Sequence, residues 1–443
     1  MRYFILWCSM CCTLLSAQTT FDLSTCLGYA RTHNLELQNS RLSEQQAHYE
    51  KRELVGTLYP QINGSFSNTY NGVLRTSIIP GEAFGGPSGS TSEVQFGTPY
   101  ESTASIQLSQ QLFNPSVGTS LKLAEQNKLL QQTSGQQTEE QLAYNIAILY
   151  YNIIIQDAQQ ANLETSAATL DSLLRQGQLQ LEQGVARQVD VDRLQVNANA
   201  LYAQIDQLKR SRVQLLNNLK LQLGMPLSED LDLQAISQQE LERQVQQPKG
   251  SVNTLAQRPD IRMMEIQSEM NELQRRMNQQ GYIPTLSLSL QGGSISNRNE
   301  LGFGNANWND YLALTVNLSV PLFDGFQRSA KHQQLKAQAN IAENNLRLTE
   351  QRASYELENA QVQYDNSNIN LDQQRMNVDL AAKVFAVSQL EYSEGIIPAT
   401  TLTEARNDLT EAQNLYFQTL LELLQARLEM AYAQGQAVQF IEQ

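Results

Sequence analysis

The side chains that most often perform chemistry are scattered along this sequence. The three histidines, His33, His48 and His332, lie far apart and do not have the spacing of metal ligands. We find no glycine-rich loop that would cradle a phosphate and no motif around a nucleophilic side chain. We therefore expect a protein that is not an enzyme and needs no cofactor or metal, and whose function comes from its architecture.

The first 17 residues have the composition of a secretory signal peptide. Arg2 is followed by an apolar run to Leu15, and we expect cleavage after Ala17. The run is shorter than the roughly 20 apolar residues that a membrane anchor needs. Three of the four cysteines would leave with this peptide, so Cys26 alone would remain and could form no internal disulfide.

Composition narrows the class of protein further. Without Arg2, the chain has 30 basic and 45 acidic residues, an acidic balance that disfavours binding to nucleic acid. No segment after residue 17 has 18 consecutive apolar residues, so we expect any membrane-crossing part to consist of strands.

The same order of elements is predicted twice along the chain. Residues 33–37 (HNLEL) correspond to residues 257–261 (QRPDI). They are followed by Tyr-Pro or Tyr-Ile-Pro, respectively, and then by an alternating strand. A second strand then leads into a long helix in each half, and that helix breaks at Gly184 or at Gly395. Such a duplication indicates that the fold consists of two similar structural repeats.

The positions of the prolines indicate where the helices can be long. None lies between Pro115 and Pro226, or between Pro321 and Pro398, and a proline inside a helix costs about 3 kcal/mol or more. Apolar residues in these intervals recur at steps of three and four, which is typical of coiled coils. Residues 120–183 alone predict a helix of about 64 residues, roughly 96 Å long.

Four strands are predicted, at about residues 60–70, 101–113, 284–292 and 311–323. Apolar and small polar residues alternate in them, so one face of each strand is apolar and the other is suited to water. Aromatic residues bracket the strands, as at the membrane interfaces of outer-membrane barrels. The predicted interface residues are Tyr59, Phe113, Tyr282, Trp308, Tyr311 and Phe323.

A half-buried sheet in a soluble domain would alternate in the same way. Residues 71–99 and 293–309, which we expect to be loops, are long for a compact domain and favour the membrane interpretation. Four strands are too few to close a barrel, so several copies must share it. Two copies would give eight strands and three would give twelve, and the sequence does not choose between them.

These features together resemble the TolC family of outer-membrane efflux proteins. The resemblance is carried by the paired NLEL and RPDIR segments, the strand exits LFNPSV and LFDGFQ, and the turns LEQGVARQVDV and YSEGIIPATTL. It covers residues 18–224 and 256–434 as two structural repeats, joined by a connector at residues 225–255 and followed by a tail at residues 435–443.

The resemblance implies a mainly α fold with a small β part. In that family, three identical chains form a twelve-stranded β-barrel in the outer membrane of a Gram-negative bacterium. A long α-helical coiled-coil barrel continues it into the periplasm. The implied partners are further copies of the chain, a periplasmic adaptor protein, an inner-membrane transporter and outer-membrane lipid, without nucleic acid.

The resemblance also places a site at the turns, residues 184–189 and 395–399. The residues implied in adaptor contact are Gly184, Val185, Gly395, Ile396 and Leu402. Glu404, Asp190 and Thr401 occupy the positions implied in the periplasmic gate, where a ring of carboxylates would favour cations. The glycines also suit a turn that needs positive φ, and acidic residues also favour the first turn of a helix, so both features have purely structural explanations as well.

The implied function is that of an outer-membrane channel in a tripartite efflux system, which conducts small molecules passively. Two alternatives remain open at this point: the outer-membrane conduit of a type I protein secretion system, and a secreted coiled-coil structural protein.

Overall fold

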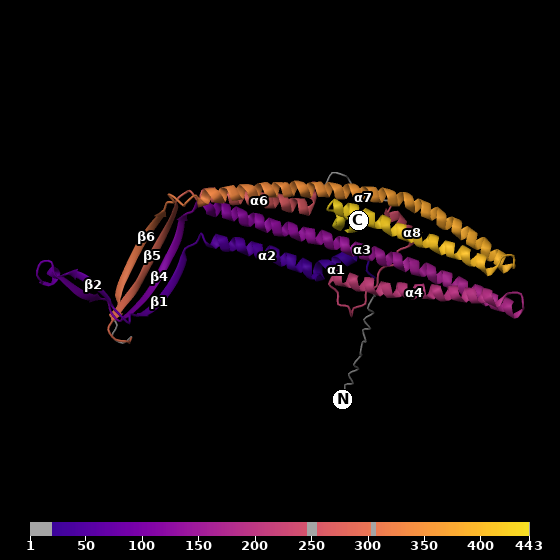
Figure 1. The fold of residues 1–443 in the computed structure, drawn as a ribbon, viewed down its shortest axis with the longest axis horizontal. Coiled ribbons are helices and arrows are strands. Elements are labelled where there is room, and N and C mark those ends of the chain that lie inside the picture. The colour runs from indigo at the N-terminus through magenta and orange to yellow at the C-terminus, as the bar shows by residue number, and fades with distance from the viewer. Residues whose placement is uncertain (1–19, 246–254, 303–306, 443) are drawn as a thin grey trace, which may run out of the picture. The chain divides into compact units, whose positions relative to one another are not determined.

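The computed structural model describes residues 20–245, 255–302 and 307–442. The expected signal peptide, residues 1–17, lies outside the described residues, as do residues 246–254 of the predicted connector. The elements in chain order (Figure 1) are α1 (Leu23–His33), α2 (Leu35–Gly56), β1 (Gln61–Tyr70), β2 (Arg75–Pro80), the 3-10 helix η1 (Gly81–Phe84), β3 (Thr91–Phe96), β4 (Tyr100–Phe113), α3 (Pro115–Glu182), α4 (Gln188–Leu223), α5 (Gln238–Val245), η2 (Leu255–Gln257), α6 (Pro259–Gln280), β5 (Thr285–Arg298), β6 (Asn309–Ser319), α7 (Gln327–Ser393), α8 (Ala399–Ala433) and α9 (Ala437–Glu442).

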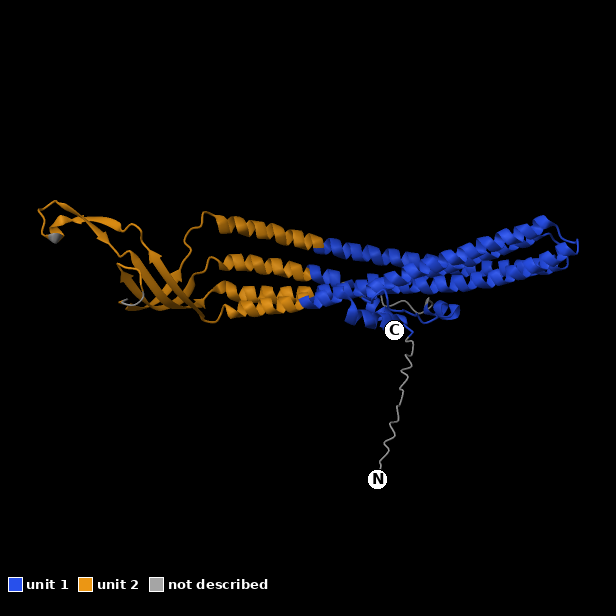
Figure 2. Cartoon of the chain, turned by 90° about the horizontal axis from the view of Figure 1, so that it is seen from below, with its two compact units in different colours: residues 1–42, 132–264, 346–443 blue, residues 43–131, 265–345 orange. Residues whose placement is uncertain are grey.

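The predicted mainly α fold and its duplication are confirmed. The series α2, β1, β4, α3, α4 recurs as α6, β5, β6, α7, α8. The chain divides into two compact units (Figure 2). Unit 1 comprises residues 1–42, 132–264 and 346–443, and unit 2 comprises residues 43–131 and 265–345. Unit 2 contains the strands β1 to β6. Unit 1 contains the turn between α3 and α4 and the turn between α7 and α8.

Unit 2 is built around an antiparallel sheet with the strand order β1-β4-β5-β6. Two neighbouring rows in the middle of the sheet align residues of like polarity across all four strands. One row consists of Ile62, Leu108, Leu290 and Leu314, and the next consists of Gln61, Ser109, Ser289 and Thr315. Because neighbouring residues of a strand point to opposite faces, the sheet has one apolar and one polar face. Among the described residues, β1 and β6 each have one partner strand and form the two edges of this sheet.

The strand boundaries differ from the prediction in places. Residues 71–99, expected to be a loop, contain the hairpin of β2 and β3, in which Arg75 pairs with Phe96. β5 continues to Arg298, beyond the predicted end at residue 292. β6 ends at Ser319 rather than at residue 323, because the proline at position 321 has no N–H to donate to a ladder.

The long helices α3 and α7 lie within the proline-free intervals, as predicted. α3 has 68 residues and begins with Pro115 at its first position. The backbone N–H that proline lacks would have no intrahelical acceptor there, so the proline costs no hydrogen bond. α7 has 67 residues. The main core of unit 1 lies where α1, α3, α4, α8 and α9 meet, and it includes Tyr150, Leu223 and Leu420. In the part of the chain that the structure describes, no helix is long and apolar enough to span a membrane.

Each repeat ends its last helix with the same turn. Met225 donates to the carbonyl oxygen of Lys220 and Gln436 to that of Ala431, both at 2.9 Å, which is the hydrogen bond of a Schellman motif. The glycine within each turn, Gly224 or Gly435, has a φ of 73° or 70°. The sequence thus ends α4 and α8 with the residue type that the left-handed conformation favours.

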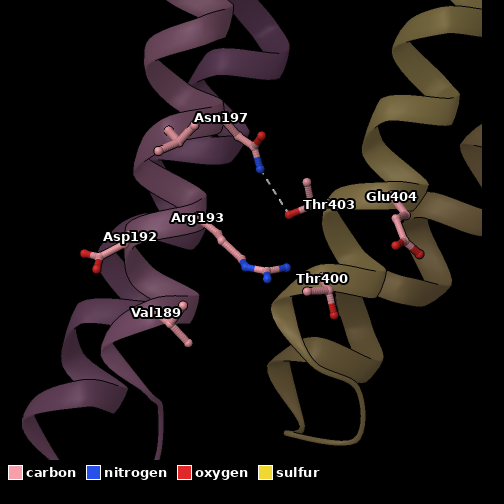
Figure 3. A pocket seen from close by; sticks show the side chains of 8 residues that line it. Val189, Asp192, Arg193, Asn197, Thr400, Thr403 and Glu404 are labelled. Atoms are coloured by element: carbon pink, nitrogen blue, oxygen red, sulfur yellow. Dashed lines mark hydrogen bonds between the residues drawn. The ribbon is translucent and has the colours of Figure 1, made fainter.

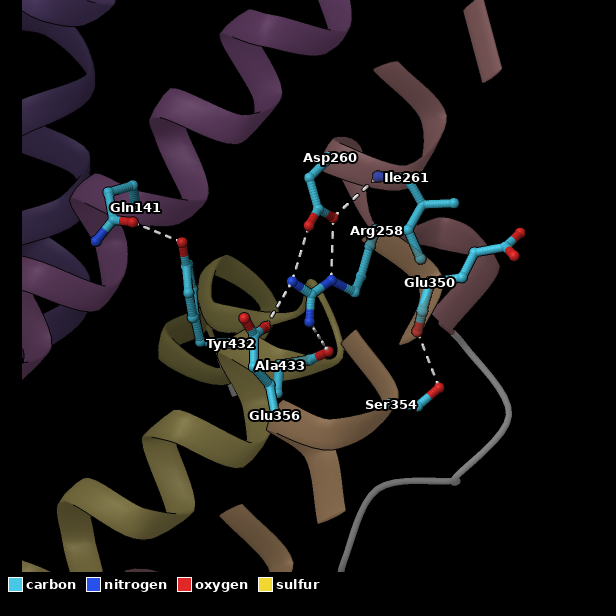
Figure 4. A network of polar contacts seen from close by, with 9 residues as sticks. All are labelled: Gln141, Arg258, Asp260, Ile261, Glu350, Ser354, Glu356, Tyr432 and Ala433. Carbon is cyan, nitrogen blue, oxygen red and sulfur yellow. Dashed lines mark hydrogen bonds and ion pairs between the residues drawn. The ribbon is translucent and has the colours of Figure 1, made fainter. Parts of the chain in front are cut away.

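Beside each of these turns, a polar side chain donates a hydrogen bond to a carbonyl oxygen at the end of the helix. Asn34 donates through Nδ2 to the carbonyl oxygen of Gln222 at 2.7 Å. In the second repeat, the Nη1 atom of Arg258 donates to the carbonyl oxygen of Ala433 at 2.9 Å, and Nη2 binds Asp260 and Glu356, each at 2.9 Å (Figure 4). The paired NLEL and RPDIR segments are therefore joints between helices.

Residues 435–443 were expected to be a short tail, but α9 forms within them. The side chain of Glu140 on α3 accepts the backbone N–H of Ala437 at 2.6 Å and that of Val438 at 3.3 Å, which satisfies donors at the start of α9. Burial raises the pKa of Glu140, although these two hydrogen bonds oppose that rise.

Candidate functional site

The turns between α3 and α4 and between α7 and α8 have the same geometry. Gly184 and Gly395 have φ of 74° and 73°. Val185 donates to the carbonyl oxygen of Gln180 and Ile396 to that of Glu391, both at 2.9 Å. These are again Schellman motifs. No neighbouring atom lies within 4 Å of the place that a β-carbon on either turn glycine would occupy, so the positive φ alone accounts for the residue type.

Each turn presents an apolar side chain to solvent. Val185 is 74% exposed and Ile396 is 70% exposed. In a Schellman motif this position commonly packs back on its own helix, so such exposure is a departure from the usual pattern. Each turn therefore offers one exposed apolar side chain that a protein partner could cover.

Leu402 is not exposed in this way, contrary to the expectation from the sequence. Its side chain is 1% exposed and lies in a cluster with Leu194 of α4 and Tyr392 of α7. Leu402 therefore packs α8 against its neighbours, and an adaptor protein could not contact it without separating the helices.

A groove runs between the first turns of α4 and α8 (Figure 3). It has a volume of about 350 Å³. Asn197 of α4 donates to the hydroxyl of Thr403 of α8 at 3.3 Å across it. Its other polar side chains come from both helices and include Asp192, Arg193, Thr400 and Glu404.

The charges in this groove are mixed in sign. Figure 3 shows the guanidinium of Arg193 directed from α4 toward α8, whereas Asp192 points away from α8. Glu404 is exposed on α8. Arg193 occupies the first-half position that corresponds to Glu404, whereas Asp192 was not singled out from the sequence. The position of Asp192, three residues after Val189, places it on the face of α4 that lines the groove and could have identified it.

Asp190 and Thr401 do not line this groove. The carboxylate of Asp190 forms an ion pair with Arg187, with an Nε to Oδ2 distance of 3.0 Å, and is mostly buried. Burial, and secondarily the nearby charge of Asp190, raises the pKa of Tyr392. Thr401 is exposed at the start of α8. The three residues implied in a gate therefore have different surroundings, and only Glu404 has a carboxylate in the groove.

The aromatic residues predicted at membrane interfaces all lie in unit 2. Tyr59, Phe113, Tyr282 and Phe323 are more than half exposed. The guanidinium of Arg328 lies over the ring of Tyr282, 4.9 Å from its centroid. The remaining two are Trp308, which is exposed, and Tyr311, which is half-buried and accepts a hydrogen bond from Gln291 at 3.2 Å.

Among the described residues, no cluster of three or more His, Cys, Asp or Glu side chains could hold a metal ion.

This chain matches one protein-family model and a set of solved structures. The family model for outer membrane efflux proteins matches residues 27–225 and 251–436. A search of curated proteins gives no match.

The solved structures show the same fold at low sequence identity. That of CusC, described in work on transmembrane channel formation, is 19% identical, with a TM-score of 0.75, and the match covers 94% of this chain and 92% of that one. The outer membrane protein VceC from Vibrio cholerae is 15% identical, with a TM-score of 0.73 and coverage of 94% and 96%. The outer membrane channel MtrE from Neisseria gonorrhoeae, in an open state, is 18% identical, with a TM-score of 0.73 and coverage of 94% and 89%.

Proposed function

We propose that this chain, which belongs to the outer membrane efflux protein family, forms a passive channel through the outer membrane of a Gram-negative bacterium. Three copies would each contribute their four strands to one closed sheet of twelve. The long helices would continue the passage into the periplasm. Energy for transport would come from an inner-membrane transporter, and a periplasmic adaptor protein would join the two.

The alignment of apolar and polar rows across the four strands supports this proposal most directly. On β6, the apolar face carries Leu312, Leu314, Val316 and Leu318, all of them at least 60% exposed in the single chain. Each such side chain gains about 1.5–3 kcal/mol when it is removed from water, so a row of them favours contact with lipid. The opposite face, with serine, threonine, asparagine and glutamine, suits a water-filled passage.

The free edges of the sheet indicate that several copies are needed. β1 and β6 have unpaired backbone groups along one side within the chain. In lipid, each such group would cost several kcal/mol, and pairing β6 of one copy with β1 of the next would remove that cost. Twelve strands leave a passage through the sheet, whereas in a closed sheet of eight the side chains fill the interior.

At the helix turns, we assign the restricting carboxylate to Glu404. Threefold repetition of an exposed glutamate at the start of α8 would favour cations over anions. Asp190 would contribute less, because Arg187 already neutralises it. The exposed Val185 and Ile396 would contact the adaptor protein together with their turn glycines.

Conductance measurements in planar lipid bilayers test the proposal. The purified protein should form cation-preferring channels, and Glu404→Gln should reduce that preference. Glu394→Gln is the matched control, since Glu394 is an exposed acid beside the same turn but does not line the groove. The absence of conductance under every condition would refute the channel. Unchanged selectivity in Glu404→Gln would refute only the assignment of the gate.

A further inference from the structure

A buried arginine without a charged partner lies between α4 and α8. Arg406 on α8 is 9% exposed. Its Nη2 atom donates to the side-chain oxygen of Asn407 at 2.8 Å, and its Nε and Nη1 atoms are enclosed without a hydrogen-bond acceptor among the described residues. Because arginine keeps its charge in proteins, Arg406 is a buried cation whose partner in the described part of the chain is a neutral amide.

Arg258 shows how this chain accommodates another buried guanidinium. That side chain is also 9% exposed, but it binds the carboxylates of Asp260 and Glu356 and the carbonyl oxygen of Ala433. Burial acts against the charge of both arginines. It lowers the pKa of Arg406, whereas at Arg258 the two carboxylates outweigh burial and raise the pKa. A buried charge without a counter-charge is strongly unfavourable, so Arg406 would gain from an anionic partner supplied from outside the chain.

Arg406 lines a groove between α4 and α8 that could receive such a partner. The groove has a volume of about 440 Å³ and adjoins the one in Figure 3, since Asn197 borders both. Gln204 of α4 and Asn414 of α8 also line it, and their amide N–H groups can donate to an anion. The exposed Glu411 lines it as well and would oppose an anion, but water screens its charge.

The shape of the guanidinium indicates the kind of anion. Its N–H groups form a planar fork that matches two oxygen atoms of one carboxylate or phosphate group. A monatomic anion such as chloride offers no second acceptor atom to this fork. The volume of the groove suits a small molecule. A small oxyanion therefore fits Arg406 best.

We propose that the groove between α4 and α8 binds a small oxyanion from solution, with the guanidinium of Arg406 as its principal ligand and the amides of Gln204 and Asn414 as further donors. Rotation of the Arg406 side chain away from Asn407 brings Nε and Nη1 to the bound ion. The ion compensates the buried charge. Binding should stabilise the folded protein, since the site exists only when α4 and α8 are packed together.

Thermal unfolding and calorimetric titration of the full-length protein in detergent test this site. Sodium phosphate and sodium acetate are the probes, and sodium chloride at the same ionic strength is the reference. We expect at least one of the two oxyanions to raise Tm by about 2 °C or more at saturation. A response to phosphate alone would identify a phosphate site, and a response to acetate would identify a carboxylate site.

Variants of the groove assign the response to its residues. Arg406→Met should abolish it, and Arg406→Lys should weaken the apparent affinity about tenfold, because lysine offers no planar fork. Glu411→Gln should strengthen binding a few-fold by removing a like charge. Arg193→Met is the matched control, since Arg193 is an exposed arginine in the neighbouring groove and its loss should leave the response unchanged.

The stability of Arg406→Met without oxyanion separates this site from other partners of the guanidinium. It should be at least as great as that of the unaltered protein, because the substitution removes an uncompensated buried charge. A large loss of stability with dissociation of the assembled protein would show that a carboxylate of a second copy pairs with Arg406, and would overturn the proposal. So would an equal response in the unaltered protein and Arg406→Met, or no response to either oxyanion.

Discussion

The guanidinium of Arg258 donates to the carbonyl oxygen of Ala433 at 2.9 Å, so the residue before α6 holds the last turn of α8. The side chain of Arg258 is 9% exposed and also forms ion pairs with Asp260 and Glu356. Asn34 makes the equivalent contact to the end of α4, and the two halves of the chain thus share one kind of joint made from different side chains.

Replacing Arg258 with methionine should destabilise the protein by about 2–4 kcal/mol, because a buried carbonyl and two carboxylates lose their partner at once. Thermal unfolding in detergent, followed by the circular dichroism of the helices, measures the change. Arg276→Met is the control, since the Arg276 side chain is 61% exposed and should contribute little. Equal effects of the two substitutions would contradict the role of the joint.

The glycines of the helix turns should differ in their tolerance of alanine. Gly184→Ala should cost about 1–2 kcal/mol, which is the penalty of a left-handed conformation for a residue with a β-carbon. Gly224→Ala should cost more, because its new β-carbon would lie 2.5 Å from the carbonyl oxygen of His33.

Unfolding of the two variants by urea, compared with Gly28→Ala in α1, measures this difference. Gly28 lies in a helix, and no atom lies within 4 Å of the place that the new methyl group would occupy, so its replacement should be neutral or slightly stabilising. A Gly224→Ala protein as stable as the Gly184→Ala protein would show that the turn at the end of α4 moves freely.

Cys26 should be inert in the folded protein. Burial raises the pKa of its thiol to about 12, so almost no reactive thiolate is present at neutral pH. An alkylating reagent should modify Cys26 only after denaturation, as mass spectrometry can verify.

The same thiol should make the free energy of unfolding depend on pH in the alkaline range. In the unfolded chain it ionises near its ordinary pKa of 9.0, and in the folded chain only near 12. Its contribution to stability is therefore complete below pH 9 and declines as the pH rises toward 12. Cys26→Ala should remove this part of the alkaline loss of stability. An unchanged alkaline profile in that variant would contradict the buried, neutral thiol.

The two faces of β6 should respond differently to charge. Leu314→Lys places an ammonium group in an apolar row, and at the middle of a bilayer this should cost about 2–4 kcal/mol. Thr315→Lys places the same group in the adjacent polar row, where water can solvate it. The first variant should assemble poorly in membranes, whereas the second should assemble normally with altered ion selectivity.

Gel mobility of membrane-extracted protein without heating reports the assembly of both variants. If Leu314→Lys assembled as well as Thr315→Lys, the apolar face of the sheet would not be in contact with lipid.

The sequence by itself determined the features whose signals are local in the chain. Alternation along residues 311–323 indicated a strand with two unlike faces, and the proline-free interval after Pro115 indicated a single long helix. These predictions succeed because the repeat of a strand or helix and the exclusion of proline act over a few neighbouring residues. The repetition of the whole pattern then indicated the duplicated fold.

Only the tertiary structure decided the relationships between distant segments. It aligned Ile62, Leu108, Leu290 and Leu314 in one row, and it buried Leu402 against Leu194 and Tyr392. It also separated Glu404, in the groove with Arg193, from Asp190, which pairs with Arg187. Strand register and side-chain burial depend on which surfaces meet in three dimensions, and a pattern within one segment specifies its faces but not the partner that covers them.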